Sequence, residues 1–214
     1  MGVGDDIKAV LFDMDGVLID ARDWHFHALN EALAPFGYEI SREDHDNRFN
    51  GLSTNAKLAI LSDENAFPRS LHEGVNQIKQ DRTLRLAGQF CFPRVDHLIL
   101  MSRLKKKGYS IGVVTNSIKS TATTMLGMAQ LLPLIDVLVT NQDVQNQKPH
   151  PEPYLLACKS LGVDPSEALV LEDGEYGYQA ASDAGCNILR VDSPNDVNME
   201  NLLKYLPSLV GENL

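Results

Sequence analysis

The chain has few cysteines, and their spacing is not typical of a metal site or a disulfide framework. Its 214 residues include three, Cys91, Cys158 and Cys186, and no two of them form a C-x-x-C pair. An odd number at such wide spacings predicts neither a structural zinc site nor a set of disulfides. We therefore expect three reduced thiols, as is usual in a cytoplasmic protein.

Long apolar segments and an excess of positive charge are also missing. No apolar run approaches the roughly 20 residues that a membrane-spanning helix needs. The chain has 19 Lys and Arg against 29 Asp and Glu, a formal net charge of −10. Nucleic acids and anionic membranes are bound through positive fields, so the composition predicts neither as a partner. An anionic substrate is still allowed, because a metal ion and one or two lysines can reverse the field inside a cleft.

The sequence does contain a series of short apolar runs, each followed by polar residues. Continuous runs of this kind are typical of strands buried on both faces. Helical patterns over 95–107, 151–161 and 176–184 lie between them, and this alternation predicts a parallel α/β sheet. The five predicted strands are 9–12, 111–114, 137–139, 168–171 and 188–191.

The region from about residue 20 to residue 90 breaks this pattern. It has no comparable strand, and four of its segments have helical patterns. Because it lies between the first strand and the next clear βα unit, we expect a helical insert over the active-site edge of the sheet. We also expect a closing helix over 195–206. The four helical segments of the insert are 21–36, 41–49, 54–61 and 70–90.

Asp13 and Asp15 directly follow the first predicted strand. In open parallel sheets, ligands bind at the carboxyl ends of the strands. Residues i and i+2 of an extended segment point the same way, so both carboxylates can face one pocket. Such a pair is costly unless a cation shares the site, and Mg²⁺ prefers oxygen ligands. The pair suggests one nucleophile and one acid/base, although a solvated Asp-Gly turn is the plainer alternative.

Two further groups lie near strand ends, and each has a structural alternative. Thr115, Asn116 and Ser117 follow the second strand, where a hydroxyl and backbone N–H groups can hold a phosphate oxygen or simply cap a helix. Lys148 begins the proline-rich loop 148–153. A lysine held there can neutralise charge on a transferring phosphoryl group, or it can be an ordinary surface lysine.

Glu172 and Asp173 follow the fourth predicted strand. Adjacent acids there suit a metal pocket, or they can be helix N-terminal acids favoured by the helix dipole. Each of the four groups has a plain explanation on its own. All four at strand ends, in this order, favour an active site.

With these motifs the chain resembles the haloacid dehalogenase (HAD) superfamily, in the branch of β-phosphoglucomutase and small-molecule phosphatases. The resemblance covers nearly the whole chain and is weaker in the insert and the tail. It implies a doubly wound, Rossmann-like parallel sheet as the core domain, 1–19 and 91–214, with an inserted all-α helical cap domain, 20–90. The matching motifs are Asp13-Met14-Asp15-Gly16-Val17, Thr115-Asn116-Ser117, Lys148-Pro149 and Glu172-Asp173.

The resemblance also implies catalytic roles. Asp13 would be the nucleophile that becomes an aspartyl phosphate. Asp15 would protonate the leaving oxygen and then activate water. Thr115 and Lys148 would hold phosphoryl oxygens. The adjacent predicted substrate contacts are Asn116 and Ser117.

By the same resemblance, the cofactor is Mg²⁺. Asp13, the backbone carbonyl of Asp15 and Asp173 would bind it, and Glu172 would act through metal-bound water. The family usually has a small hydroxyl residue after the acid pair, where this chain has Gly174. A hydrogen bond to the metal ligands can therefore be missing, and a water can replace it.

Three residues of the insert are predicted substrate contacts. His25 falls where the mutase branch has a histidine near the catalytic aspartate, although it can equally be a structural first-turn residue. Asn50 and Thr54 stand where the mutase has a lysine and an arginine that grips the far phosphate. Because an arginine fork is the natural partner of a second phosphate, its absence argues against mutase chemistry and against a bisphosphate substrate, and we expect no strong anion clamp in the cap. Lys57 is close in sequence, but nothing in the sequence places it in the pocket.

We therefore predict a Mg²⁺-dependent phosphatase that hydrolyses a small phosphorylated metabolite, such as a sugar phosphate. We expect a cytoplasmic monomer or weak homodimer, with no nucleic-acid or membrane partner. The alternatives are a β-phosphoglucomutase-type mutase and a non-catalytic binding protein on the same fold. The nucleophile, lysine and metal acids are all present, which argues against the binding protein.

Overall fold

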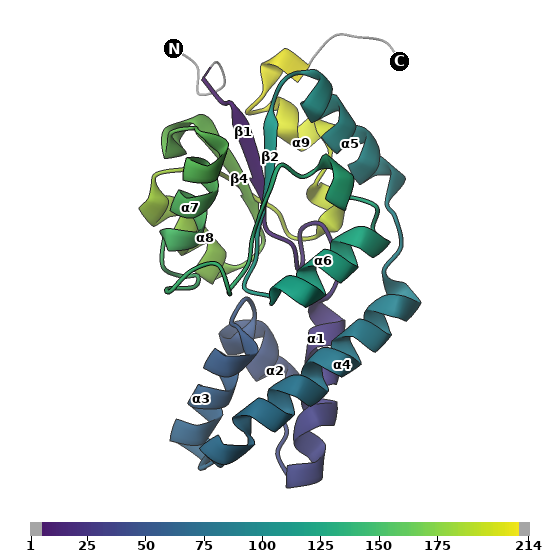
Figure 1. Ribbon diagram of the computed structural model, residues 1–214, viewed down its shortest axis with the longest axis vertical. Helices are drawn as coiled ribbons and strands as arrows, with labels where there is room; N and C mark the ends of the chain where they lie inside the picture. Colours follow the sequence, from purple (N-terminus) through teal and green to yellow (C-terminus); the bar gives the residue numbers. More distant parts are fainter. Residues whose placement is uncertain (1–5, 210–214) are drawn as a thin grey trace.

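A five-stranded parallel sheet lies at the centre of the upper lobe of the protein (Figure 1). The computed structural model describes residues 6–209. The strands lie side by side in the order β3-β2-β1-β4-β5, which confirms the predicted parallel α/β sheet. They match the predicted runs to within one residue at each end. Their bounds are β1 Ala9–Phe12, β2 Ser110–Val114, β3 Val137–Val139, β4 Ala168–Glu172 and β5 Asn187–Arg190.

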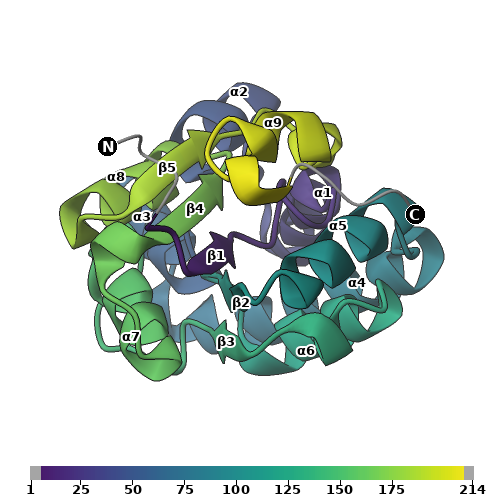
Figure 2. The ribbon, with the colours of Figure 1, turned by 90° about the horizontal axis from the view of Figure 1, so that it is seen from above.

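Helices cover both faces of this sheet (Figure 2). They are α5 Val95–Lys106, α6 Lys119–Met128, α7 Glu152–Leu161, α8 Glu175–Ala184 and α9 Met199–Leu203. One apolar cluster joins the sheet to α5, α6 and α9, and a second joins its other face to α7 and α8. The sheet is therefore doubly wound, as predicted.

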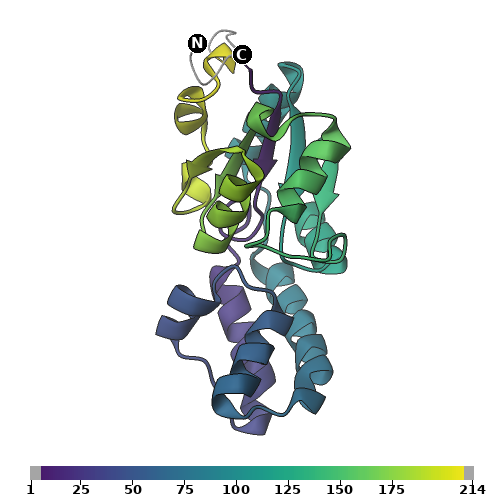
Figure 3. The ribbon, with the colours of Figure 1, turned by 90° about the vertical axis from the view of Figure 1, so that its left-hand side faces the viewer.

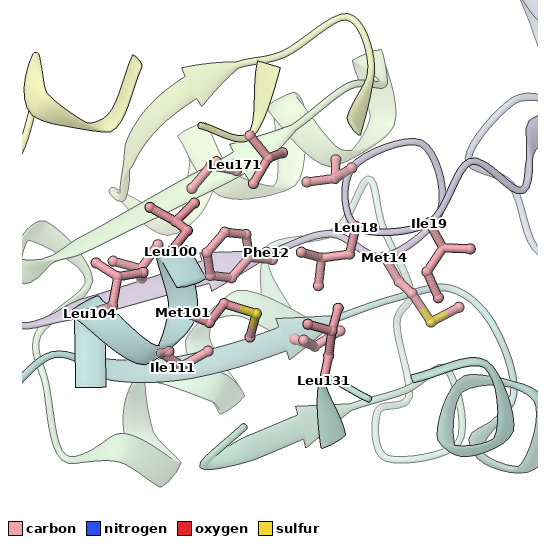
Figure 4. Packing of buried hydrophobic residues seen from close by; sticks show 14 of the residues in the cluster. Phe12, Met14, Leu18, Ile19, Leu100, Met101, Leu104, Ile111, Leu131 and Leu171 are labelled. Atoms are coloured by element: carbon pink, nitrogen blue, oxygen red, sulfur yellow. The ribbon is translucent and has the colours of Figure 1, made fainter. Parts of the chain in front are cut away.

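The alternation of side chains along β1 explains why its sequence is continuously apolar. Val10 and Phe12 pack in the cluster with α5 and α6, whereas Ala9 and Leu11 pack in the cluster with α7 and α8. All four are fully buried, because both faces of a parallel sheet are covered. Figure 4 shows Phe12 among neighbours from α5, β2 and β4, which include Leu100, Met101, Leu104, Ile111 and Leu171.

Four helices form the second lobe, at the lower end of Figures 1 and 3. They are α1 Arg22–Leu33, α2 Arg42–Asp44, α3 Thr54–Asn65 and α4 His72–Phe90, and a π-helical turn, His45–Phe49, continues α2. The lobe has its own apolar core, which includes Leu29, Leu58 and Phe67. Because α1 follows β1 and α4 precedes α5, two connections join the lobes.

Two parts of the chain differ from the sequence prediction. Helix α6 was not predicted, because its threonines and glycine have low helix propensity. It forms because Ala122, Met125 and Leu126 bury one face against the core. The closing helix predicted over 195–206 is present but shorter. Asn198 has an extended backbone and caps a new helix, so only α9 is α-helical there.

The register of the sheet brings the predicted motifs together. Phe12 pairs with Val113 on one side and Leu171 on the other. The carboxyl ends of β1, β2 and β4 therefore lie at one edge, which faces the helical lobe (Figure 1). Among residues 6–209, no helix is both long and apolar enough to cross a bilayer.

Candidate active site

The loop after β1 turns sharply and holds Asp13 and Asp15 in one pocket between the lobes. The Gly16 N–H donates to the Ile19 carbonyl at 2.7 Å. Gly16 has φ +94°, and a Cβ there would lie 2.1 Å from Asp173 Oδ2. Glycine is therefore required at this position both by the backbone conformation and by the closeness of the next acidic motif.

Asp13, Glu172 and Asp173 form a cluster in which one carboxylate oxygen from each residue lies within 4.8 Å of the others. Burial and the neighbouring Glu172 raise the pKa of both Asp13 and Asp173. A Cβ on Gly177 would lie 1.8 Å from Glu172 Oε1, so only glycine lets α8 approach that carboxylate this closely. Crowded acids with hard oxygen donors are a ligand set that fits Mg²⁺.

Lys148 is buried and contacts two of these three acids. Its ammonium donates to Asp13 Oδ1 at 2.7 Å, Glu172 Oε1 at 2.6 Å and the Val114 carbonyl at 2.7 Å. Burial opposes its charge, but the two carboxylates raise its pKa. All three donors are used. Lys148 therefore holds the acids in place, and contact with a phosphoryl oxygen requires it to give up one of these partners.

Asp15 is held from both sides. Ser117 Oγ donates to Asp15 Oδ2 at 2.9 Å, and His25 Nε2 lies 3.0 Å from Asp15 Oδ1. On the far side of the ring, Lys79 Nζ lies 3.0 Å from His25 Nδ1. A charged Lys79 donates to Nδ1, which places the imidazole proton on Nε2, facing Asp15. Ser117 and His25 thus contact Asp15 in this structure, although both were predicted to contact substrate.

The pKa values of this group favour a neutral histidine and an ionised Asp15. Burial and the neighbouring Lys79 lower the pKa of His25. Burial opposes ionisation of Asp15, yet His25 and the Ser117 hydroxyl bring its pKa below the usual value. At neutral pH, Asp15 is therefore a carboxylate able to accept a proton.

Thr115 and Asn116 have different positions in the site. Thr115 lines the pocket, and its Oγ1 accepts from the Ser117 N–H at 3.0 Å. Asn116 Nδ2 donates to the Gly51 carbonyl at 2.8 Å and to the Lys148 carbonyl at 3.2 Å. Asn116 therefore ties the loop after β2 to the helical lobe.

Asn50 and Thr54 line the helical side of the pocket, but two lysines line it as well. These are Lys57 on α3 and Lys79 on α4. Two lysines therefore line the side of the pocket where the sequence predicted no strong anion clamp. The signal in the sequence was helical spacing, because Lys57 lies three residues after Thr54 and Lys79 lies three residues after Asn76, another lining residue.

Sequence reasoning also missed Arg22, which donates to Asp173 Oδ2 at 2.7 Å. At Gly174, the departure from the family pattern leaves α8 with no side-chain cap. A Cβ there would meet nothing within 4 Å. The position therefore has room for the hydroxyl residue that the family usually carries.

The sequence matches the family profile described as haloacid dehalogenase-like hydrolase over residues 10–191. It is 29% identical over 191 residues to a pyrophosphatase from Bacillus velezensis, covering 84% of this chain and 80% of that protein. It is 29% identical over 203 residues to a phosphoglycolate phosphatase from Escherichia coli, covering 85% and 80%. The fold is similar to that of a β-phosphoglucomutase from Clostridium difficile, with a TM-score of 0.82, 24% identity, and 96% and 100% of the two chains covered. The chain therefore belongs to the haloacid dehalogenase-like hydrolase family.

Proposed function

We propose that this protein is a Mg²⁺-dependent phosphatase that hydrolyses a small phosphorylated metabolite. The observation that carries the proposal is the pair Asp13 and Asp15 in one pocket, with Lys148 and two further acids around Asp13. The phosphatase and pyrophosphatase names of the two similar proteins support the same reaction class. In this proposal, 20–90 is the cap over a core made of 1–19 and 91–214.

The first chemical step uses Asp13 as the nucleophile. A carboxylate oxygen of Asp13 attacks phosphorus, and the bond from phosphorus to the ester oxygen breaks. The leaving oxygen takes a proton from Asp15, and an aspartyl phosphate remains on Asp13. Asp15 must carry a proton for this step. The negative charge of an arriving phosphate favours that protonated form, because a nearby like charge raises the pKa of a carboxyl group.

The second step uses Asp15 as the base. Now ionised, it accepts a proton from a water molecule whose oxygen attacks phosphorus. Phosphate leaves, the Asp13 carboxylate is restored and Asp15 is protonated again. Ser117 and His25 hold the Asp15 carboxylate in place for both proton transfers.

Charge on the transferring group is stabilised by several residues. Thr115 lines the pocket with its hydroxyl, and Lys148 keeps positive charge beside Asp13. Asp13, Asp173 and the Asp15 carbonyl would hold Mg²⁺, with Glu172 acting through water. When bound, Mg²⁺ neutralises charge on the phosphoryl oxygens.

A mutase of the β-phosphoglucomutase type is the second candidate. Lys57 and Lys79 favour it, because they place positive charge where a second phosphate could be held. The two reactions are separated by incubating the protein with β-glucose 1-phosphate and a trace of the sugar bisphosphate. With a set of phosphate monoesters as substrates, we expect the protein to release free phosphate. The sugar bisphosphate should not stimulate this release. Formation of glucose 6-phosphate faster than free phosphate would move the chain to the mutases.

Replacing Asp173 with alanine is expected to weaken Mg²⁺ binding by about tenfold or more, because a hard oxygen ligand is removed. Calorimetric titration of Mg²⁺ into the wild type and the variant measures this change directly. Asp183→Ala, which removes an exposed acid from α8, is the matched control and should bind Mg²⁺ normally. Chelation should stop catalysis by the wild type, and full activity in excess chelator would contradict the metal assignment.

A further inference from the structure

Lys57 is a buried cationic side chain with no partner in the described chain. It lies in the first turn of α3, is 6% exposed and lines the same pocket as Asp13. Its ammonium makes no hydrogen bond or ion pair with any of residues 6–209. Burying an unpaired charge is costly, so a lysine in this position indicates a ligand that supplies the missing partner.

Two neighbouring groups on the same wall of the pocket also indicate an anionic ligand. Lys79 has the neutral His25 as its side-chain partner, and no carboxylate pairs with it at ion-pair distance within the described chain. His45 is 1% exposed and lines the same pocket, and neither of its ring nitrogens has a side-chain hydrogen-bond partner within residues 6–209. Within the part of the chain that the structure describes, this wall therefore carries two lysines with no carboxylate partner.

The acids that face these lysines are engaged elsewhere. They all come from the core side of the pocket: Asp13, Asp15, Glu172 and Asp173. Lys148 pairs with Asp13 and Glu172, whereas Arg22 pairs with Asp173. Ser117 and His25 hold Asp15. Within residues 6–209, none of these acids forms an ion pair with Lys57 or Lys79, although Asp15 favours the charged form of both lysines.

Burial, and for Lys57 also repulsion by Lys79, opposes the charged form of these lysines. Burial and the neighbouring Lys79 lower the pKa of Lys57 to about 7. Burial lowers the pKa of Lys79 to about 8, although Asp15 acts in the opposite direction. His45 has a pKa near 4, because it is buried and lies near Lys57. A bound anion would favour the charged form of both lysines.

We propose that Lys57, together with Lys79, binds a second anionic group of the substrate, at the end away from the phosphate that Asp13 attacks. This inference rests on the proposed function and names its substrate class: a short phosphate monoester that also carries a carboxylate or a second phosphate. Both groups offer oxygens for charge-assisted hydrogen bonds from an ammonium. Lys57 is thus a specificity-determining residue, and Asp13 and Asp15 perform the chemistry.

Turnover of three-carbon substrates with different ends tests the proposal. Glycerol phosphate ends in a hydroxyl, phosphoglycerate in a carboxylate and propanediol bisphosphate in a phosphate. The wild type should prefer one or both anionic ends by about tenfold or more in kcat/KM. Lys57→Met should reduce kcat/KM for the preferred substrate by about 10- to 100-fold, mainly through KM, and by less than about threefold for glycerol phosphate.

Lys159→Met is the control, because it removes the same charge from an exposed position on α7. It should leave all three values unchanged. The values of kcat/KM for phosphoglycerate and propanediol bisphosphate are then compared. The larger value identifies carboxylate or phosphate as the recognised group. No preference in the wild type, or an equal loss for all three substrates in Lys57→Met, would overturn the proposal.

Binding without turnover separates this proposal from the proposed reaction. Phosphonoacetate and ethylenediphosphonate carry a second anionic group, whereas ethylphosphonate does not, and none has an ester bond to hydrolyse. At least one of the doubly anionic compounds should raise the Tm of the wild type more than ethylphosphonate does, and Lys57→Met should lose this difference. If no substrate releases phosphate but this difference is found, the phosphatase assignment fails and the anion site stands. An equal Tm shift with all three compounds in the wild type would reject the anion site.

Discussion

Replacing Asp13 with asparagine is expected to lower phosphate release by roughly 10⁴-fold or more, because the carboxamide cannot form the aspartyl phosphate. The fold should survive. The asparagine side chain keeps nearly the same shape and retains an oxygen that can accept the 2.7 Å hydrogen bond from Lys148. The variant should therefore behave as a folded protein without a nucleophile.

The same substitution should change how stability depends on pH. Burial and Glu172 raise the pKa of Asp13 above its value of 3.8 in an unfolded chain. An acid of this kind binds its proton more tightly in the folded state, so its contribution to stability falls as pH rises above about 4. Asparagine has no such proton. Urea unfolding across pH should therefore show a flatter profile for the variant, measured without Mg²⁺.

The expected loss of catalysis is checked by measuring phosphate release by the purified variant. The substrate is the phosphate monoester that the wild type hydrolyses fastest. Asp183→Ala serves again as a control, because it removes an exposed carboxylate and should retain full activity. Near-normal turnover by Asp13→Asn would rule out the covalent mechanism. An unfolded variant would instead show that the Asp13 carboxylate is needed for the fold.

Replacing Lys148 with methionine is expected to destabilise the protein by about 3–5 kcal/mol at neutral pH, the usual cost of removing one partner from a buried ion pair. The Lys148 side chain is 4% exposed and contacts Asp13 and Glu172. Methionine fills similar space but leaves two buried carboxylates without their counter-charge. Activity should fall as well, because the nucleophile is no longer held.

The loss should depend on pH in a defined direction. Because the carboxylates raise the pKa of Lys148, its ion pairs contribute fully below the unfolded value of 10.5 and are lost as pH rises through the higher folded value. At low pH the carboxylates take up protons, and the difference between wild type and variant should shrink there too. Urea unfolding of the wild type and the variant at acidic, neutral and strongly alkaline pH measures how their difference in stability shrinks at low and at high pH.

Lys159→Met is the control for Lys148→Met, because it removes an equal charge from an exposed site on α7 and should change stability by less than about 0.5 kcal/mol. Added Mg²⁺ should partly restore Lys148→Met, because a divalent cation replaces the missing charge near the acids. If Lys148→Met unfolds at the same urea concentration as the wild type, the buried ion pairs contribute nothing to stability.

The sequence by itself determined the sheet and the place of the motifs that we propose to be catalytic. Strands buried on both faces need continuous apolar residues, so runs such as 9–12 and 168–171 could be recognised locally. Parallel strands all end at the same edge. Asp13, Glu172 and Asp173 could therefore be assigned to one site, although more than 150 residues separate the two motifs.

Only the tertiary structure decided which side chains pair with those acids and which side chains line the other side of the pocket. Lys148 satisfies Asp13 and Glu172, whereas Arg22 and Lys79 reach the site from α1 and α4. Helical spacing allowed Lys57 to face the pocket, but periodicity alone does not say which face of a helix is turned toward another lobe. That choice depends on how α3 and α4 pack on one another and over the sheet. The energy of a charged group depends on its burial and its partners, which are properties of the folded arrangement and not of the local sequence.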